Sequence, residues 1–291
     1  MKVDHVLVLA AGKGTRMGNI GKEVPKLLWP IFEKTLLELQ TDFAKRIAPS
    51  AQVHVNLYNF KDKILKYISL NQAQFLHVDF LEEEQKIDIG GAVHNLASKL
   101  EYKGNLLILN GDQFLMSDPE VILSKVQCLN KAGVVLFSYE VNSDDGYGCL
   151  NIENNLLKGI IPNSEQKRNT INQTYTGMSL VNLETLIPKA GASSFFQSVA
   201  DPSKSRVEVV LMKDFEYWDF GTTKRYINSM NMLMQKQESE MYKFLVDENA
   251  LHLELVNGRT YNSNSGIELS EFSINEDSVV YNGIKELITP E

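Results

Sequence analysis

Short apolar runs alternate with segments of helical periodicity over the first 140 residues of the chain. Five runs have the length and composition of buried parallel strands, and they cover residues 6–9, 53–57, 75–80, 106–109 and 134–139. Apolar residues at helical spacing predict helices between them, over 36–47, 64–70, 91–100 and 119–129. This alternation predicts an α/β fold in which helices cover both faces of a largely parallel sheet.

The loops at the carboxyl ends of these strands are where we expect the chemistry. Ligands of such sheets bind beyond the carboxyl ends of the strands. The candidate loops therefore follow Leu9, Phe80 and Leu109.

The pattern changes in the second half of the chain. Residues 145–185 read as short strands separated by polar turns, which predicts an antiparallel insertion that forms one wall of a substrate pocket. Thr222 is the expected N-cap of a helix that runs to about residue 245. We therefore divide the chain into a main domain of residues 1–240 and a small strand-rich appendage of residues 241–291, to which we assign oligomer contacts.

Composition and charge narrow the possible functions. The 291 residues include 29 Lys+Arg and 37 Asp+Glu, which gives a net charge of −8. Such acidity argues against a nucleic-acid binder with a broad basic face. The two cysteines, Cys128 and Cys149, are too few for a disulfide framework or a cysteine-based zinc site. The sequence also has no apolar run long enough to span a membrane and no signal-peptide pattern, so a cytoplasmic location is expected.

The strongest motif is the glycine loop after Leu9, which reads AAGKGTRMG and is followed by PKLL at 25–28. Small residues let a backbone approach a ligand closely and point N–H groups at phosphate oxygens. The small residues of this loop are Ala10, Ala11, Gly12, Gly14 and Thr15. Arg16 can hold a phosphate through two parallel hydrogen bonds, and Lys26 can supply a second positive charge.

Two other glycine-rich loops are excluded by spacing. A dinucleotide fingerprint needs Gly-x-Gly-x-x-Gly, whereas three residues separate Gly14 from Gly18. A Walker A loop needs Ser or Thr after Gly-Lys, whereas Gly21-Lys22 is followed by Glu23.

Together these motifs resemble the signature of sugar-1-phosphate nucleotidyltransferases. Four further stretches follow in the family's order: IDIGGAV at 87–93, LNGDQ at 109–113, YTGMSLVN at 175–182 and WDFGT at 218–222. The IDIGGAV form is most similar to the branch that contains N-acetylmuramate-1-phosphate uridylyltransferases and mannose- or heptose-1-phosphate guanylyltransferases. The resemblance implies a three-layer α/β/α sandwich with a mixed, mostly parallel Rossmann-like sheet, of the nucleotide-diphospho-sugar transferase type.

The resemblance also implies a reaction. A sugar-1-phosphate oxygen attacks the α-phosphorus of a nucleoside triphosphate, pyrophosphate leaves, and an NDP-sugar forms. Because two polyanions must meet, the site needs cations and alignment more than an acid–base pair. The family pattern assigns catalytic roles to Arg16 and Lys26, and it assigns Mg²⁺ or Mn²⁺ to the two aspartates Asp112 and Asp219.

The remaining site residues follow from the same comparison. The glycine loop, residues 10–16, corresponds to the triphosphate site, and Gly90 and Gly91 correspond to the stretch beside the base and ribose. Glu83, from the acidic run at 82–84, is the carboxylate we expect to reach the nucleotide. The positions that match the family's sugar contacts are Tyr147, Gly148, Thr176 and Gly177.

The chain departs from the family pattern in two places. Ile89 stands where this branch has a small residue beside the base. The insertion also lacks a Glu-Lys pair whose lysine touches the sugar phosphate. Lys158, Lys167 or Arg168 could replace that lysine, or Lys26 alone could hold the acceptor phosphate.

Three functions therefore remain open. The first is an enzyme that joins UTP or GTP to a hexose- or heptose-1-phosphate, for a cell-surface polysaccharide or for wall recycling. The second is a CTP-dependent cytidylyltransferase that acts on a phosphorylated alcohol such as choline phosphate. The third is a non-catalytic subunit that binds a nucleotide-sugar.

Overall fold

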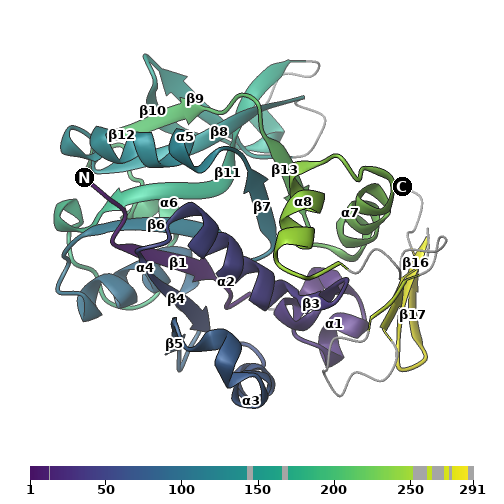
Figure 1. The fold of residues 1–291 in the computed structure, drawn as a ribbon. Helices are drawn as coiled ribbons and strands as arrows, with labels where there is room; N and C mark the ends of the chain where they lie inside the picture. The colour runs from purple at the N-terminus through teal and green to yellow at the C-terminus, as the bar shows by residue number, and fades with distance from the viewer. Residues whose placement is uncertain are drawn as a thin grey trace.

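A computed structural model describes residues 1–12, 14–142, 147–165, 170–251, 261–263, 272–274 and 277–287. Its centre is a nine-stranded mixed sheet with the order β5-β4-β1-β6-β11-β8-β12-β10-β9 (Figure 1). These strands are β1 (His5–Leu9), β4 (Gln52–Leu57), β5 (Val78–Glu82), β6 (Asn105–Asn110), β8 (Val134–Asn142), β9 (Cys149–Glu153), β10 (Leu156–Ile161), β11 (Ile171–Asn182) and β12 (Val207–Leu211).

Four neighbouring strands, β5, β4, β1 and β6, run parallel, and their carboxyl ends meet at one edge. Leu9 pairs with Asn56 of β4 on one side and with Asn110 of β6 on the other. Leu57 pairs in turn with Glu82 of β5. The loops after all four strands therefore open onto the same edge, as the sequence pattern predicts.

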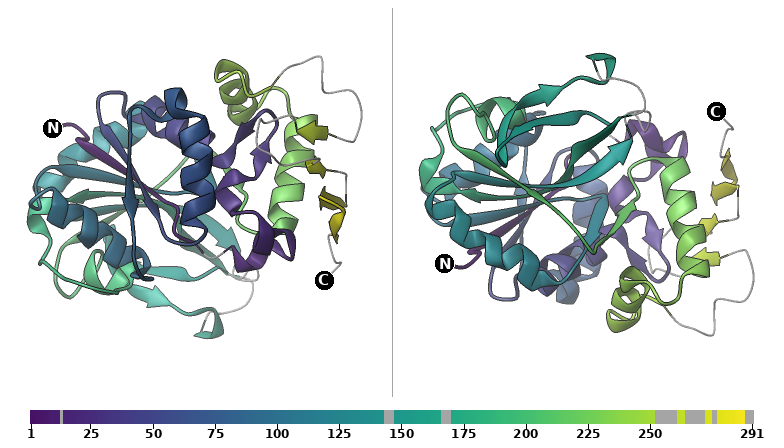
Figure 2. Two further views of the ribbon diagram at one scale, coloured as in Figure 1. Left: turned by 90° about the horizontal axis from the view of Figure 1, so that it is seen from below. Right: turned by 90° about the horizontal axis from the view of Figure 1, so that it is seen from above.

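Helices cover both faces of this sheet, so the fold has the three layers expected (Figure 2). Along β1 the buried side chains alternate: Val6 and Val8 pack in the cluster that includes α2, whereas Leu7 packs with α4. The helices are α1 (Ile20–Glu23), α2 (Leu36–Ile47), α3 (Lys61–Leu70), α4 (Asp88–Lys99), α5 (Pro119–Leu123), α6 (Phe195–Ser198), α7 (Thr223–Gln235) and α8 (Glu240–Asp247). None of the described helices is both long and apolar enough to cross a membrane.

Three predicted elements differ from those observed. The strand expected at 75–80 lies later, at β5, because Gln72–Phe75 forms a 3₁₀ helix that buries Phe75. The helix expected over 119–129 is α-helical only in α5, which Asp118 caps, and it continues as a 3₁₀ helix. The helix expected from Thr222 to about 245 is broken into α7 and α8, and Ser239 caps the second part.

The strands of the predicted insertion, β9, β10 and β11, pair antiparallel with their neighbours, whereas β12 runs parallel to β8. Strand β11 pairs antiparallel with both β6 and β8, and β9 and β10 form a hairpin at the far edge. A separate two-stranded ladder joins β7 (Gln113–Met116) to β13 (Glu216–Asp219), and a second joins β2 (Pro30–Ile31) to β3 (Lys34–Thr35).

The C-terminal residues pack onto the main core. Phe244 and Leu245 of α8 are fully buried in the same cluster as α2. The four-stranded sheet of β14 (Tyr261–Ser263), β15 (Phe272–Ile274), β16 (Ser278–Tyr281) and β17 (Ile284–Leu287) lies beside α7 (Figure 1). The ring of Phe272 lies 5.2 Å from that of Trp29. In the described part of the chain, the residues after 240 therefore share the main hydrophobic core and form no second core of their own.

This packing yields a stability prediction. Phe272 is 1% exposed, so Phe272→Ala should lower the free energy of unfolding by about 3 kcal/mol in denaturant titration, through lost burial and a cavity. Leu287→Ala on β17, where the side chain is 54% exposed, is the control and should change it by less than about 0.5 kcal/mol. Equal small effects of both substitutions would show that the C-terminal sheet does not share the core.

Candidate active site

A cavity of about 460 Å³ lies at the carboxyl edge of the four parallel strands. It is lined by the loops or last residues of those strands, by the 25–27 segment, by the turn after β13, by the first residues of α4 and β7, and by Ile64 of α3. The predicted site residues in its lining are Ala10, Ala11, Gly12, Gly14, Thr15, Arg16, Lys26, Glu83 and Asp112. The structure thus brings together residues that are distant in sequence.

The glycine loop turns sharply at this edge. Gly14 adopts a left-handed conformation with φ of 63°, and its carbonyl accepts a hydrogen bond of 2.9 Å from the Met17 amide. Residues Thr15–Met17 then form one 3₁₀ turn, with Met17 buried and Arg16 exposed at the cavity. The burial of Met17 fixes the direction in which the Arg16 side chain leaves the loop.

The loop is held from two other directions. Asn56, at the end of β4, accepts a hydrogen bond of 2.8 Å from the Ala10 amide and donates one of 2.7 Å to the Glu83 carboxylate. At the other end of the loop, Glu286 of β17 accepts a 2.5 Å hydrogen bond from the Asn19 amide. Its carboxylate fills the space beside Gly18, where a side-chain carbon would collide with it.

Glu83 is a buried acid in the cavity wall. Only 5% of the residue is exposed, and burial raises the pKa of its carboxyl, while the hydrogen bond from Asn56 partly opposes the rise. Within the acidic run at 82–84, Glu83 is therefore buried, whereas Glu82 and Glu84 are exposed.

Asp112 lies two residues after the end of β6 and forms an ion pair with Lys26. Both side chains are only 15% exposed, so their charges interact with limited screening by water. Gly111 lets the chain reach this position, since a side-chain carbon there would stand 2.6 Å from the Leu9 carbonyl oxygen.

Asp219 ends β13 and lies beside Asp112. Its carboxylate accepts hydrogen bonds of 2.7 Å from the Gly221 amide and from the guanidinium of Arg225. Burial disfavours the charged form of that guanidinium, but Asp219 together with the neighbouring Tyr147 and Tyr217 outweighs the burial, and the pKa of Arg225 lies above its ordinary value. The end of β13 therefore presents the Asp219 carboxylate together with a permanently charged partner, Arg225.

The two aspartates converge on one point. Asp112 Oδ2 and Asp219 Oδ1 each lie 2.9 Å from the position that a side-chain carbon on Gly221 would occupy. The backbone ladder explains this approach, since Asp219 pairs with Gln113 and the Phe220 amide donates to the Asp112 carbonyl. Only the fold brings these residues together, as expected from their separation in sequence.

This pair fits a hard divalent cation. Carboxylate oxygens are the ligands that Mg²⁺ prefers, and Mg²⁺ is commonly held by one or two carboxylates together with water and phosphate oxygens. No group of three or more acidic, histidine or cysteine ligands occurs among the described residues. Asp112 and Asp219 would therefore hold the ion and leave its other coordination positions open to water and substrate oxygens.

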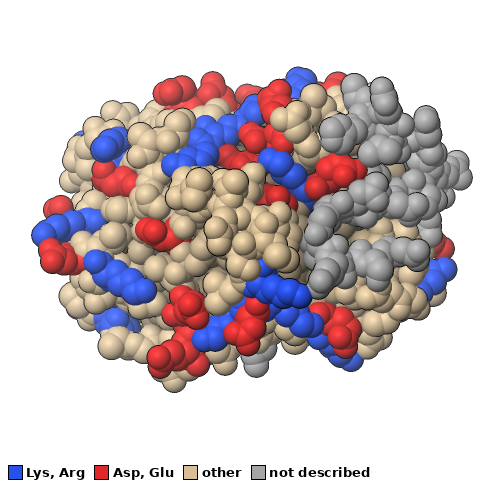
Figure 3. All heavy atoms as spheres, turned by 60° about the horizontal axis from the view of Figure 1, so that its bottom comes forward, with Lys and Arg blue, Asp and Glu red and all other residues tan. Residues whose placement is uncertain are grey.

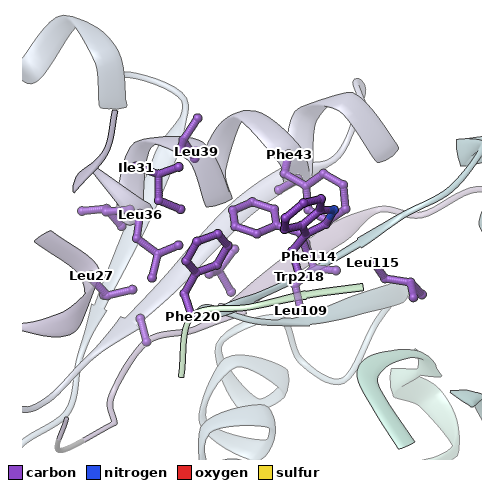
Figure 4. Close-up of a cluster of buried hydrophobic side chains, with 14 of the residues drawn as sticks. Leu27, Ile31, Leu36, Leu39, Phe43, Leu109, Phe114, Leu115, Trp218 and Phe220 are labelled. Atoms are coloured by element: carbon purple, nitrogen blue, oxygen red, sulfur yellow. The ribbon is translucent and has the colours of Figure 1, made fainter. Parts of the chain in front are cut away.

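Aromatic packing fixes both aspartates from below. Trp218 and Phe220, on either side of Asp219, are buried, and the Phe220 ring meets the Phe114 ring edge-on at 5.9 Å (Figure 4). Phe114 in turn lies two residues after Asp112 and packs against Phe43 of α2. The carboxylates thus stand on a rigid apolar layer.

A group of aromatic side chains lies next to this pair, towards the insertion. The Arg225 guanidinium lies 5.1 Å from the centre of the Tyr147 ring. Tyr139 is close to Tyr147 and lies 5.0 Å from Tyr217, between ring centres. Arg225 therefore contacts both Asp219 and Tyr147, which is a predicted sugar contact.

Other predicted substrate contacts have structural partners instead. Thr176 is buried, and its hydroxyl donates to the Phe137 carbonyl. Gly177 lies against Asn110 and Gln113, and Gly148 is exposed. None of these residues lines the cavity.

Gly90 and Gly91, the predicted base and ribose contacts, do not line the cavity in this structure. Both glycines are buried, and side-chain carbons at these positions would collide with the backbone of the 191–194 segment. The preceding Asp88 and Ile89 line the cavity. The two glycines thus allow α4 to pack closely against this segment, and their contact with a base and ribose stays a prediction.

Sequence reasoning missed several residues of the site. Asn56 lies near the end of β4, Asn59 follows that strand, and Lys86 follows the acidic run; all three line the cavity. Gln113 lies within the LNGDQ motif and donates to Asp219 at 3.4 Å. Arg225 was detectable only as a basic residue in the first turn of the helix after WDFGT.

The molecular surface carries mixed charge. On the face in Figure 3, basic and acidic side chains are interspersed, and no broad basic area occurs among the residues described in that view. This arrangement agrees with the acidic net charge of −8.

Comparison with known proteins gives one consistent family. A GlmU bifunctional protein from Trichormus variabilis is 27% identical over 224 residues, which are 72% of this chain and 48% of that protein. A D-glycero-alpha-D-manno-heptose 1-phosphate guanylyltransferase from Campylobacter jejuni is 26% identical over 149 residues, or 51% of this chain and 63% of that protein. The chain spans half the length or less of the GlmU proteins that it matches, between 37% and 48%.

Solved structures share the fold. HddC from Yersinia pseudotuberculosis, in a complex with GMP-PN, superposes with a TM-score of 0.64 at 20% identity, over 80% of this chain and 99% of that one. A UDP-glucose pyrophosphorylase complexed with UDP-glucose gives a TM-score of 0.61 at 16% identity, with the same coverage of 80% and 99%. The mixed sheet covered by helices is therefore of the nucleotide-diphospho-sugar transferase type. The sequence model of the nucleotidyl transferase family matches residues 5–236, and the chain belongs to that family.

Proposed function

We propose that this protein condenses a nucleoside triphosphate with a sugar-1-phosphate to give an NDP-sugar and pyrophosphate. The observation that carries the proposal is the convergence of two cations and two carboxylates, Arg16, Lys26, Asp112 and Asp219, at the carboxyl edge of the sheet. A phosphate-binding protein without catalysis needs the cations but has no use for two adjacent carboxylates.

Each residue has a role that follows from its position. Arg16 extends from the glycine loop into the cavity, where it suits the triphosphate. Lys26 lies against Asp112, so its charge is next to the point where phosphates and carboxylates meet. A divalent ion held by Asp112 and Asp219 would draw charge from the phosphate oxygens during displacement.

We favour UTP or GTP as the nucleotide and a hexose- or heptose-1-phosphate as the acceptor. Similarity to a heptose 1-phosphate guanylyltransferase supports a heptose and guanine, whereas a neighbour that binds UDP-glucose supports uracil. Ile89 is 40% exposed in the cavity wall, where it offers the base an apolar contact without selecting purine or pyrimidine. These soluble substrates support a cytoplasmic reaction.

A second candidate pair is choline phosphate with CTP. Ring faces attract quaternary ammonium groups, and the tyrosines Tyr139, Tyr147 and Tyr217 cluster beside Arg225, which already covers the Tyr147 ring. The same carboxylates and cations would serve this cytidylyltransferase reaction.

The deciding experiment measures pyrophosphate release with Mg²⁺ for four nucleoside triphosphates, each combined with a panel of sugar-1-phosphates and choline phosphate. We expect one combination to exceed the others by at least about tenfold in kcat/KM, as a defined pocket discriminates by at least about 1.4 kcal/mol. Absence of turnover, together with a melting temperature raised by an NDP-sugar, would replace the proposal with a non-catalytic binding subunit.

Asp112→Asn tests the carboxylate pair. The amide keeps the shape but removes a charge, so we expect kcat to fall by at least about a hundredfold while the melting temperature stays close to that of the wild type. Asp62→Asn, at an exposed position in α3, is the matched control and should retain wild-type kcat. Wild-type pyrophosphate release by the Asp112 variant would refute the role of this carboxylate.

Glu83 gives a pH-dependent prediction. Because burial raises the pKa of Glu83, the folded protein binds this proton more tightly than the unfolded chain. Its contribution to stability is therefore present at low pH and declines as pH rises through the folded-state pKa. The free energy of unfolding of the wild type minus that of Glu83→Gln should fall as pH rises above about 4, the ordinary pKa of a glutamate.

Denaturant titrations at several pH values measure this difference. The exposed neighbour provides the control, since Glu84→Gln should follow the pH dependence of the wild type. A difference that is constant, or that grows with pH, would contradict the effect of burial on Glu83.

A further inference from the structure

The family pattern does not identify which residue of this chain binds the phosphate of the acceptor in the proposed reaction. A sugar phosphate or an alcohol phosphate carries its own negative charge, and it must approach a second polyanion. The insertion lacks the Glu-Lys pair whose lysine would hold that phosphate. Lys26 lies in the cavity assigned to the triphosphate, paired with Asp112, so a second basic side chain close to the carboxylates would be free for the acceptor. This inference rests on the proposed function.

Lys158 is not in a position to replace the missing lysine. It lies on β10, where its Nζ is 3.4 Å from Glu153. Lys158 lines a separate hollow together with Lys204 and Arg206, and no residue of that hollow lines the nucleotide cavity. Lys167 and Arg168 lie outside the described residues.

Arg225 is the basic residue that the structure places at the right point. It lies in the first turn of α7, six residues after Asp219, and one guanidinium nitrogen is 2.7 Å from the Asp219 carboxylate. Its side chain is 36% exposed, so a phosphate can reach the remaining N–H groups. A guanidinium has five N–H donors in a planar fork that matches two phosphate oxygens.

The position of Arg225 also separates it from the triphosphate. Arg16 and Lys26 line the cavity formed by the parallel strands, whereas Arg225 does not and instead lies over Tyr147 of the insertion. Asp112 and Asp219 are therefore adjacent, but their basic partners, Lys26 and Arg225, lie towards different parts of the site.

We infer that Arg225 binds the phosphate of the acceptor and thereby takes the place of the missing insertion lysine. Tyr147 supports the guanidinium through its ring face, and Asp219 fixes one edge of it. An arginine in this place holds a phosphate by two parallel hydrogen bonds, so the attacking oxygen is oriented as well as neutralised. Arg225 is thus an acceptor-binding residue rather than part of the triphosphate site.

Steady-state kinetics of Arg225→Gln and Arg225→Lys with the productive substrate pair test this inference. Removing a charged hydrogen-bond donor should raise the acceptor KM about tenfold to a hundredfold and change the KM of the nucleoside triphosphate by less than about threefold. The lysine variant should recover part of the loss because it keeps the charge without the fork. Lys158→Gln is the matched control and should leave both KM values unchanged.

Binding without turnover provides the second readout. Titration calorimetry of the metal-free protein with the acceptor phosphate should show weaker binding for Arg225→Gln, while binding of the nucleoside triphosphate stays at the wild-type affinity. Melting temperatures identify a variant that fails to fold, and Arg225→Lys then carries the test.

The outcomes separate the two proposals. If the wild type is active but Arg225→Gln lowers only kcat, with an unchanged acceptor KM, Arg225 merely positions Asp219 and the inference is wrong. An acceptor KM raised by Lys158→Gln instead would assign the phosphate to the insertion. If the wild type converts no substrate pair, it is the proposed function that fails.

Discussion

Two like charges at close quarters are the constraint on which this site depends. Asp112 and Asp219 both reach to within 2.9 Å of one point beside Gly221, and isolated carboxylates would repel each other there. Asp112 pairs with Lys26 and Asp219 pairs with Arg225, so the two negative charges are balanced by two positive charges before any substrate binds. The protein can therefore keep a strongly charged site folded, while a phosphate that enters meets cations already in place.

The sheet supplies the precision that this arrangement needs. Parallel register places the ends of β1, β4 and β6 side by side, and the short β7–β13 ladder adds Asp219 from a distant part of the sequence. Beneath the carboxylates, the buried rings of Phe114 and Phe220 limit any lateral shift. Side chains on such elements are positioned more exactly than those on a long loop.

Much of the fold was predictable from the chain, and the reasons for the errors are physical. Apolar runs such as 106–109 indicated buried strands, and β6 confirms that one. Phe75 misled the prediction because an aromatic residue can enter the core from a 3₁₀ turn as well as from a strand. The convergence of Asp112 with Asp219, and the place of Arg225, depend on tertiary pairing, which a linear pattern does not contain. Gly90 and Gly91 pack closely against neighbouring backbone, a feature that the motif letters alone cannot reveal.

The hydrogen bond between Glu286 and the Asn19 amide joins the last described strand to the first functional loop. During synthesis on the ribosome, the glycine loop therefore emerges 267 residues before its partner. This loop completes its set of contacts only after β17 has been synthesised and has docked. Nascent chains that end before β17 thus present the glycine loop without this anchor.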